Sequence, residues 1–292
     1  MENDISGSVF LEELTLKCFP ELVESLKKDI PRSLMMLGCL EQMNESPEVT
    51  SGHVYVSHWP NPDLVMFENM AYKSLTDYNI PPSVIFASCS TEKLKMTLEK
   101  SHLSRFTSSP EILVGDPRCF EIGNEITKSK GNGLQVTLQS LPYFATVTDV
   151  TKLEKHECPP GYFIAPLRLH DAVLINTMWK FGGNPNSLKR FKNLISHSLT
   201  AGVYYQDTDQ LVSWGLIAEY GCISMLHTLE CHRRRGLAMA IVYHLTKTLL
   251  DRRRTVFCVI EEENENSRQL FCKMGFKIFS SDYVAFLYTS QS

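Results

Sequence analysis

Several features that would place this chain in a specialised class are missing from its 292 residues. Its nine cysteines are odd in number and scattered, and no C-x-x-C pair occurs. This pattern argues against a secreted disulfide framework and favours reduced thiols in an intracellular protein. Basic residues are not in excess either, since 29 Lys and Arg stand against 33 Asp and Glu, for a net charge of −4. That balance gives no reason to expect nucleic acid as a partner.

Long apolar runs and targeting signals are also missing. No apolar stretch approaches the roughly 20 residues that a membrane-spanning helix needs. Residues 1–4 are acidic, and they resemble neither a secretory signal nor an Arg-rich mitochondrial presequence. We therefore expect a cytoplasmic protein without a membrane partner, with the mitochondrial matrix as the alternative compartment. The sequence leaves the oligomeric state open.

The composition is that of a folded protein. Hydrophobic residues make up 43% of the chain, and its length suits one large domain or two ordinary ones. Two prolines and a glycine interrupt regular structure within residues 155–161. We therefore expect one domain over residues 1–155 and a second over residues 160–292.

The elements of the first half are only partly readable. A helix is expected over residues 8–28, with Pro20 marking a break or a new first turn. No clear pattern extends over residues 104–133, which are rich in Ser, Pro and Gly. The other expected elements are strands at 34–43, 53–59 and 64–67 and a helix at 91–102.

The second half has a clearer pattern. Short linkers join three expected strands, which should form an antiparallel meander. A strand–helix–strand order follows, which makes a parallel crossover. The fold class is therefore mixed α/β (α+β), with a meander passing into a parallel βαβ unit. In order, we expect a strand at 163–167, a helix at 170–181, a helix from an Asn186–Ser187 cap to 199, strands at 202–206, 211–220 and 222–229, a helix at 236–250, a strand at 255–261, a helix at 265–273 and a strand at 282–288.

One short motif stands where an anion can bind. Arg233, Gly236 and Ala238 fit the pattern R-x-x-G-x-A directly before the apolar helix 236–250. A helix start presents unpaired N–H groups and the positive end of the helix dipole, which together bind phosphate groups. Glycine lets the backbone approach a diphosphate closely, and the arginines add positive charge. The alternative is that this basic segment is an ordinary solvated surface, because short motifs recur by chance.

Two motifs in this order resemble the GNAT superfamily of acyl-CoA-dependent acyltransferases. The first is the R-x-x-G-x-A loop, and the second is N-x-x-S-x-x-L-F-x-x-x-G-F over residues 264–276. Three further segments, at 179–187, 211–214 and 227–229, resemble one branch, the glycine N-acyltransferase-like proteins of animals. The first half resembles that branch mainly through His58-Trp59-Pro60 and its opening helix.

The resemblance implies two tandem GNAT-like domains, the first of them degenerate. It also implies acyl-CoA or acetyl-CoA as co-substrate, no metal, and a small amine or amino-acid acceptor such as glycine. The strands at 222–229 and 255–261 should splay apart and hold the pantetheine arm. The residues assigned to the acyl-CoA site are Met225, Leu226, His227, Thr228, Leu229, Arg233, Arg234, Arg235, Gly236, Leu237, Ala238, Asn264, Ser267 and Phe271.

The catalytic residues depart from the family pattern. Cys222 occupies the position where similar enzymes carry a glutamate, which leaves Glu219 and His227 as candidates for the base. Phe271 replaces the usual tyrosine acid, and Tyr283 is the candidate substitute. The backbone N–H groups near residues 225–226 can serve the oxyanion.

Each of these candidates has an ordinary structural reading beside the catalytic one. Glu219, His227 and Tyr283 can simply be packed or hydrogen-bonded strand residues. A Cys222–His227 nucleophile needs a strand bulge to bring the two side chains to one face. A zinc site at His227, Cys231 and His232 lacks a fourth ligand. Asn264 can either hold the coenzyme or cap its helix, and Ser213 can line an acceptor pocket.

Three functions remain open at this point. The first is transfer of an acyl group to the amine of an amino acid. The second is acetylation of a polyamine, an arylamine or a protein amine, which an acidic acceptor cleft would favour. The third is an acyl-CoA-binding protein that has lost its catalytic groups.

Overall fold

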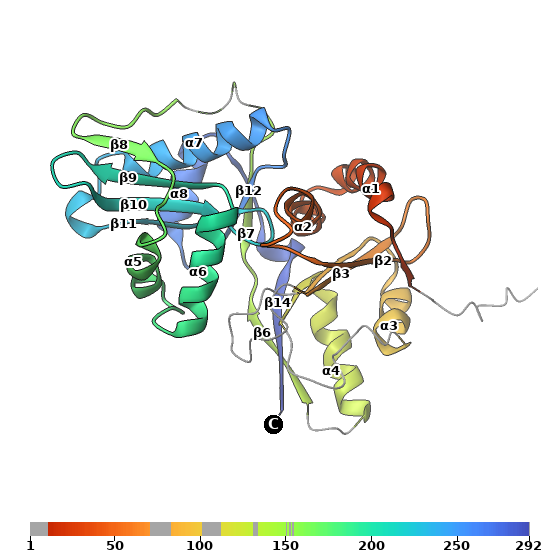
Figure 1. Cartoon of the computed structure of the whole chain (residues 1–292). Helices are drawn as coiled ribbons and strands as arrows, with labels where there is room; N and C mark the ends of the chain where they lie inside the picture. The colour runs from red at the N-terminus through yellow and green to blue at the C-terminus, as the bar shows by residue number, and fades with distance from the viewer. Residues whose placement is uncertain are drawn as a thin grey trace, which may run out of the picture.

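The protein folds around two mixed sheets of seven strands each, as the computed structural model in Figure 1 shows. The structure describes residues 11–70, 83–100, 112–130, 134–149, 151, 153 and 155–291. Each sheet is covered by helices on both faces, so the chain forms four separate buried clusters of apolar side chains.

The first sheet has the order β1-β2-β3-β4-β5-β14-β6. Helices α1 (Phe19–Leu26) and α2 (Leu34–Glu45) pack on one face, and α3 (Thr91–Lys100) and α4 (Arg118–Lys130) pack on the other. Its strands are β1 (Glu12–Glu13), β2 (Gly52–Val56), β3 (Leu64–Asn69), β4 (Ser83–Ala87), β5 (Ile112–Gly115), β6 (Leu134–Ser140) and β14 (Ala285–Gln291).

The second sheet has the order β8-β9-β10-β11-β12-β7-β13. Helices α5 (Asp171–Met178) and α6 (Pro185–His197) cover one face, and α7 (Leu237–Asp251) and α8 (Glu265–Lys273) cover the other. Its strands are β7 (Tyr143–Thr146), β8 (Tyr162–Ala165), β9 (Thr200–Tyr205), β10 (Gln210–Ile217), β11 (Ile223–Thr228), β12 (Phe257–Ile260) and β13 (Lys277–Phe279).

The two sheets repeat one topology and exchange one strand. In each, four strands are followed by a strand in parallel pairing, β4 with β5 and β11 with β12. The sixth strand of each sheet comes from the other half of the chain: β14 joins β5 and β6, and β7 joins β12 and β13. This repetition agrees with two tandem GNAT-like units of mixed α/β class, as expected from the sequence. The exchanged strands cross the boundary expected at residues 155–160.

The expectation of a strand at 34–43 is wrong, because this segment forms helix α2. The helix is buried along almost its whole length, from Leu34 to Met43. It packs on the first sheet and also contacts the second sheet through Phe144 and Phe257. Gly38 lies so close to the turn at 220–221 that a Cβ atom there would clash with the carbonyl oxygen of Tyr220. A helix enclosed on all sides loses its amphipathic period, and a short apolar run then resembles a buried strand.

Other boundaries also moved. The expected helix 8–28 begins only at Phe19, with Pro20 in its first turn, and residues 8–10 lie outside the described part. Helix α6 is capped by Asn184 rather than by residues 186–187. The Asn184 side chain accepts a hydrogen bond from the N–H of Ser187, and the Ser187 hydroxyl accepts one from the N–H of Asn184, which makes a capping box. The segment without a clear pattern contains β5 and α4, and residues 101–111 and 131–133 are not described.

Candidate functional site

The start of helix α7 is open. Gly236 is its N-cap residue with φ of 81°, and no side chain caps the first turn in the described structure. A Cβ atom at Gly236 would meet only the Met239 side chain, at 3.9 Å. The three preceding arginines, Arg233, Arg234 and Arg235, are exposed. Bare N–H groups and the helix dipole therefore stand beside exposed arginines, where a diphosphate can dock.

Strands β11 and β12 separate immediately beside this loop. Within the described residues their ladder holds a single pair, Ile223 with Cys258. Met225 has φ of 54°, and the β10–β11 register shifts by one residue at this point, which marks a bulge. Backbone groups of β11 that face β12 are thus left without ladder partners and can bind an extended ligand arm. The expected splay of the two strands is confirmed.

Side chains along β11 pack to both faces of the second sheet. Leu226 packs on the core beneath α7, Met225 packs on the core beneath α5 and α6, and Leu229 contacts both. Ser213 on β10 is fully buried and donates a hydrogen bond to the backbone oxygen of His227. Its hydroxyl also lies 2.7 Å from that of Thr228. The hypothesis that Ser213 lines an acceptor pocket is therefore corrected: it fixes the end of β11.

His227 is half-buried and stacks on Trp214, with ring centroids 4.8 Å apart and an angle of 27° between the ring planes. Its Nε2 atom is buried and has no hydrogen-bond partner among the described residues. Burial lowers the pKa of this imidazole, and the positive charge of Arg233 lowers it further. A neutral histidine with an unpaired ring nitrogen can accept a proton.

The pH dependence of turnover tests this role of His227. If its imidazole takes the proton of the acceptor amine, kcat/KM should fall as the pH drops through a pKa that lies below 6.5. Replacing Arg233 with Gln removes one of the two causes that lower the His227 pKa, so the midpoint of the acidic limb should move to higher pH. A His227→Gln variant that kept the same acidic limb would show that another group is titrating.

Glu219 is not an accessible base. Its carboxylate is fully buried and accepts two hydrogen bonds from Arg190 of α6, at 2.6 and 2.8 Å. The Arg190 guanidinium also lies over the Trp179 ring, 5.0 Å from its centroid. A carboxylate held in this way has no route to an acceptor amine, so its role as a base is corrected. No local pattern reveals Arg190, because its partner lies 29 residues away in the sequence.

The buried pair predicts a strong asymmetry between single and double variants. Arg190→Met leaves the Glu219 charge buried and unpaired, which should cost about 3–5 kcal/mol of folding free energy. The double variant Arg190→Met/Glu219→Leu should recover most of that loss and bind CoA as the native protein does. Denaturant unfolding and CoA titration measure both quantities. A stable double variant without turnover would restore Glu219 as a chemical participant.

Cys222 is also displaced from the chemistry, and Tyr283 lies against β13. Cys222 is buried in the core against α2, and burial raises the pKa of its thiol well above the ordinary value. The bulge at Met225 leaves about four strand steps, or about 13 Å, between Cys222 and His227. Tyr283 borders a cavity of about 350 Å³ whose other lining residues include Arg32 and Arg118, and its ring packs edge-on against Phe279 of β13. The Cys222 candidacy is therefore corrected, and the role of Tyr283 as an acid stays a prediction.

The second motif positions a helix rather than a ligand contact. The Asn264 side chain caps α8 by accepting a hydrogen bond from the N–H of Ser267, at 3.1 Å. Phe271 is buried and packs edge-on against Phe276 in the core under α7 and α8. Leu237 is buried in the same core, so only its backbone can serve a ligand. Of the expected coenzyme residues, the structure therefore brings together the 225–229 strand and the 233–238 loop.

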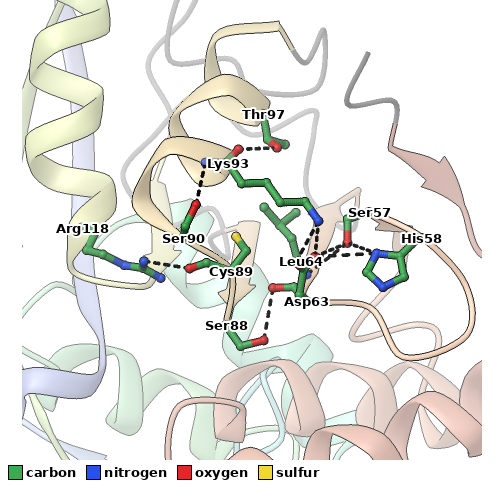
Figure 2. A network of polar contacts seen from close by, with 10 residues as sticks. All are labelled: Ser57, His58, Asp63, Leu64, Ser88, Cys89, Ser90, Lys93, Thr97 and Arg118. Atoms are coloured by element: carbon green, nitrogen blue, oxygen red, sulfur yellow. Dashed lines mark hydrogen bonds and ion pairs between the residues drawn. The ribbon is translucent and has the colours of Figure 1, made fainter. Parts of the chain in front are cut away.

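The helix at the matching place in the first sheet is closed (Figure 2). Helix α3 follows β4 as α7 follows β11, but the Ser90 hydroxyl accepts a hydrogen bond from the Lys93 N–H in its first turn. Glu92 adds negative charge there. Arg118 donates to the Cys89 carbonyl oxygen at the end of β4. Of these two corresponding helices, α7 has an open start and α3 has a capped one.

Figure 2 also shows a Ser–His–Asp group that does not form a catalytic relay. Ser57 donates to Asp63 at 2.7 Å, and the Nδ1 atom of His58 faces both of them. Lys93 contacts both Asp63 oxygens at 2.8 Å. A relay needs the two different ring nitrogens of the histidine, one for each partner. The group instead ties the turn after β2 to helix α3.

The described residues contain neither a metal-ligand cluster nor a membrane-spanning helix. No set of three or more His, Cys, Asp or Glu side chains is arranged to hold a metal ion. None of the described helices has both the length and the apolar character needed to cross a membrane.

Comparison with known proteins identifies the class. Residues 14–198 match the family model "Aralkyl acyl-CoA:amino acid N-acyltransferase", and residues 200–284 match "FR47-like protein". Together with the two sheets and the open helix start, these matches define an acyl-CoA N-acyltransferase of the GNAT type. The first match covers more than half of the chain, so the protein belongs to the aralkyl acyl-CoA:amino acid N-acyltransferase family.

Similar proteins span nearly the whole chain. Human glycine N-acyltransferase-like protein 2 is 25% identical over 88% of this chain and 90% of its own length. Bovine glycine N-acyltransferase is 27% identical over 90% and 93%. A solved Drosophila protein has a TM-score of 0.73 at 18% identity, covering 98% of this chain and 99% of its own. A tandem GNAT protein from the clavulanic acid pathway has a TM-score of 0.54 at 11% identity, covering 97% and 98%. These structures support the tandem fold alone.

Proposed function

We propose that this protein transfers an acyl group from acyl-CoA to the amine of glycine or another small amino acid. The observation that carries the proposal is the uncapped start of α7 beside the gap between β11 and β12. The diphosphate of CoA would lie on the N–H groups of residues 237–239, and Arg234 and Arg235 would balance its negative charge. The pantetheine arm would pair with the free edge of β11.

The chemistry follows from the end of this groove. The neutral amine attacks the thioester carbonyl carbon, a C–N bond forms, and the C–S bond breaks. N–H groups at the Met225 bulge would stabilise the oxyanion. The amine proton passes to His227 Nε2, directly or through water, and the thiolate leaving group takes up one proton to give free CoA. Proximity contributes much of the rate, because the enzyme holds both reactants together.

Release of free thiol tests the proposal. The purified protein is incubated with acetyl-, a longer alkanoyl- and an aromatic acyl-CoA, each with every one of the twenty amino acids. We expect thiol release that depends on both partners and an acylated amino acid in the product. Tight CoA binding without release in any pairing would instead support the acyl-CoA-binding protein that has no catalysis.

A different amine is the second candidate. Three consecutive glutamates, at 261–263, are exposed directly after β12. Lys180 makes an ion pair with the first of them. Carboxylates near the groove attract cationic acceptors, so a polyamine, an arylamine and a lysine peptide belong in the same assay. Turnover with these and none with amino acids would reverse the assignment.

We place the protein in a reducing compartment, the cytoplasm or, alternatively, the mitochondrial matrix. All nine cysteines are free; five of them are buried, among them Cys39, Cys119 and Cys258, and two more are partly exposed. Reduced thiols of this kind suit an intracellular protein.

A further inference from the structure

Three aromatic side chains gather under the arginine loop, and the function proposed above does not use them. Tyr162 on β8, Tyr205 at the end of β9 and His232 have ring centroids 5.4 to 5.8 Å apart. The Tyr162 hydroxyl is hydrogen-bonded to the Nδ1 atom of His232 at 2.9 Å. Tyr162 is buried, and it faces Tyr205 in the β8–β9 ladder. We call these three residues the aromatic anchor.

The anchor lies at the base of a loop with unusual backbone angles. Arg234 has φ of 61°, a left-handed value that a side chain disfavours, and Gly236 follows with φ of 81°. Such a conformation persists only where its surroundings hold it. His232 precedes Arg233 directly, and its side chain ties the loop to β8 of the sheet. Its own N–H donates to the Leu229 carbonyl oxygen at 2.9 Å.

The second tie is made by Arg233 itself. Its Nε atom donates to the backbone oxygen of Thr228 at 3.1 Å, so the guanidinium is turned back toward the end of β11. Arg234 and Arg235 are thereby left at the open face of the loop. Arg233 is exposed, so water competes for its hydrogen bond to Thr228. The hydrogen bond between Tyr162 and His232 is half-buried and is therefore the stronger constraint on the loop.

We propose that His232 and Tyr162 are positioning residues for acyl-CoA: they hold the arginine loop in the left-handed form that presents its N–H groups and charges to the coenzyme phosphates. The proposal rests on the function proposed above. It assigns a role to a histidine whose sequence neighbours suggested only an incomplete zinc site. Loss of the Tyr162–His232 hydrogen bond should weaken binding of the phosphate-bearing end of CoA and leave binding of the pantetheine arm unchanged.

Separate halves of the ligand test this role. We would measure the Kd of CoA, of 3′-phosphoadenosine 5′-diphosphate and of pantetheine for the native protein and for Tyr162→Phe. Loss of one hydrogen bond should weaken CoA and the nucleotide by the same factor, about three- to tenfold. Pantetheine binding should stay unchanged. Tyr143→Phe in β7 is the matched control, and it should bind all three ligands as the native protein does.

A second set of variants tests the same role in case the Tyr162→Phe protein does not fold. His232→Ala should weaken the nucleotide about tenfold, and His232→Asn, which keeps a polar atom near the Nδ1 position, should recover part of that loss. Combining Tyr162→Phe with His232→Ala should be no worse than His232→Ala alone, because both remove one bond. Thermal unfolding of the free proteins shows whether any loss reflects general destabilisation.

The outcomes separate this role from the proposed function. Native nucleotide affinity in both Tyr162→Phe and His232→Ala would overturn the positioning role while leaving CoA binding in place. Equal weakening of pantetheine and nucleotide would also overturn it, because a general loss of structure would then be the cause. A native protein that binds neither CoA nor the nucleotide would sink the proposed function itself.

Discussion

Arg235→Glu should weaken CoA binding by about 100-fold or more, with the fold retained. The side chain is exposed before α7, so reversing its charge leaves the core untouched. The variant loses a charge-assisted contact to the phosphates and adds repulsion, and 100-fold corresponds to about 2.8 kcal/mol. Calorimetric titration with CoA measures the loss, and circular dichroism checks the fold.

Two matched controls sharpen this test. Arg253→Glu makes the same charge reversal just past the far end of α7, on another exposed arginine. Gly236→Asp blocks the helix start with a carboxylate, and Gly183→Asp places the same residue at a glycine of almost equal φ, 82°, between α5 and α6. We expect both control proteins to bind CoA normally. Similar losses in a control and its partner variant would mean that the assigned pocket is wrong.

Leu287→Asp should unfold the protein or prevent it from accumulating in folded form. Leu287 is fully buried in β14, which pairs with β5 on one side and β6 on the other. A carboxylate buried without a partner costs several kcal/mol, comparable to the total stability of many domains. Leu16→Asp makes the same chemical change at a leucine that is 71% exposed, and it should cost little.

The unfolding transition of β14 variants shows whether the two sheets unfold together. The second half of the chain supplies β14 to the first sheet, and the first half supplies β7 to the second sheet. A substitution that destabilises one sheet should therefore destabilise the other as well. We therefore expect a milder variant, Leu287→Ala, to lower the midpoint of one shared denaturant transition. Hydrogen exchange should show protection lost in β4, β5 and β11 together. Independent unfolding of the two sheets at separate midpoints would contradict this expectation.

Much of the second half could be predicted from the sequence, because its signals are local. Helix α8 has the expected bounds, 265–273, since Asn264 supplies a cap and the apolar spacing is regular. The meander and the loop before α7 follow from short turns and from a motif that works through backbone geometry. The wrong assignment of α2 arose where burial on all sides erased the period of the helix.

The catalytic candidates could not be judged from the sequence, because their surroundings depend on distant residues. Cys222 stands at the position where similar enzymes carry a glutamate, and Glu219 is a nearby titratable residue, yet the fold buries both. Nothing within a few residues of Glu219 reveals the arginine that neutralises it. The anchoring of His232 by Tyr162 is equally invisible, since 70 residues separate the partners. Pairings between distant residues depend on topology, and a strand pattern alone does not say which sheet the strand joins.

The position of β14 after all the other described elements sets an order for biosynthesis. The gap between β5 and β6 stays unfilled until β14 has been translated, which is after every other described element has been made. Meanwhile β7, made before β12 and β13, has to wait for its neighbours. The nascent first half therefore carries open strand edges for most of its synthesis, and chaperones that shield such edges would find their substrate there.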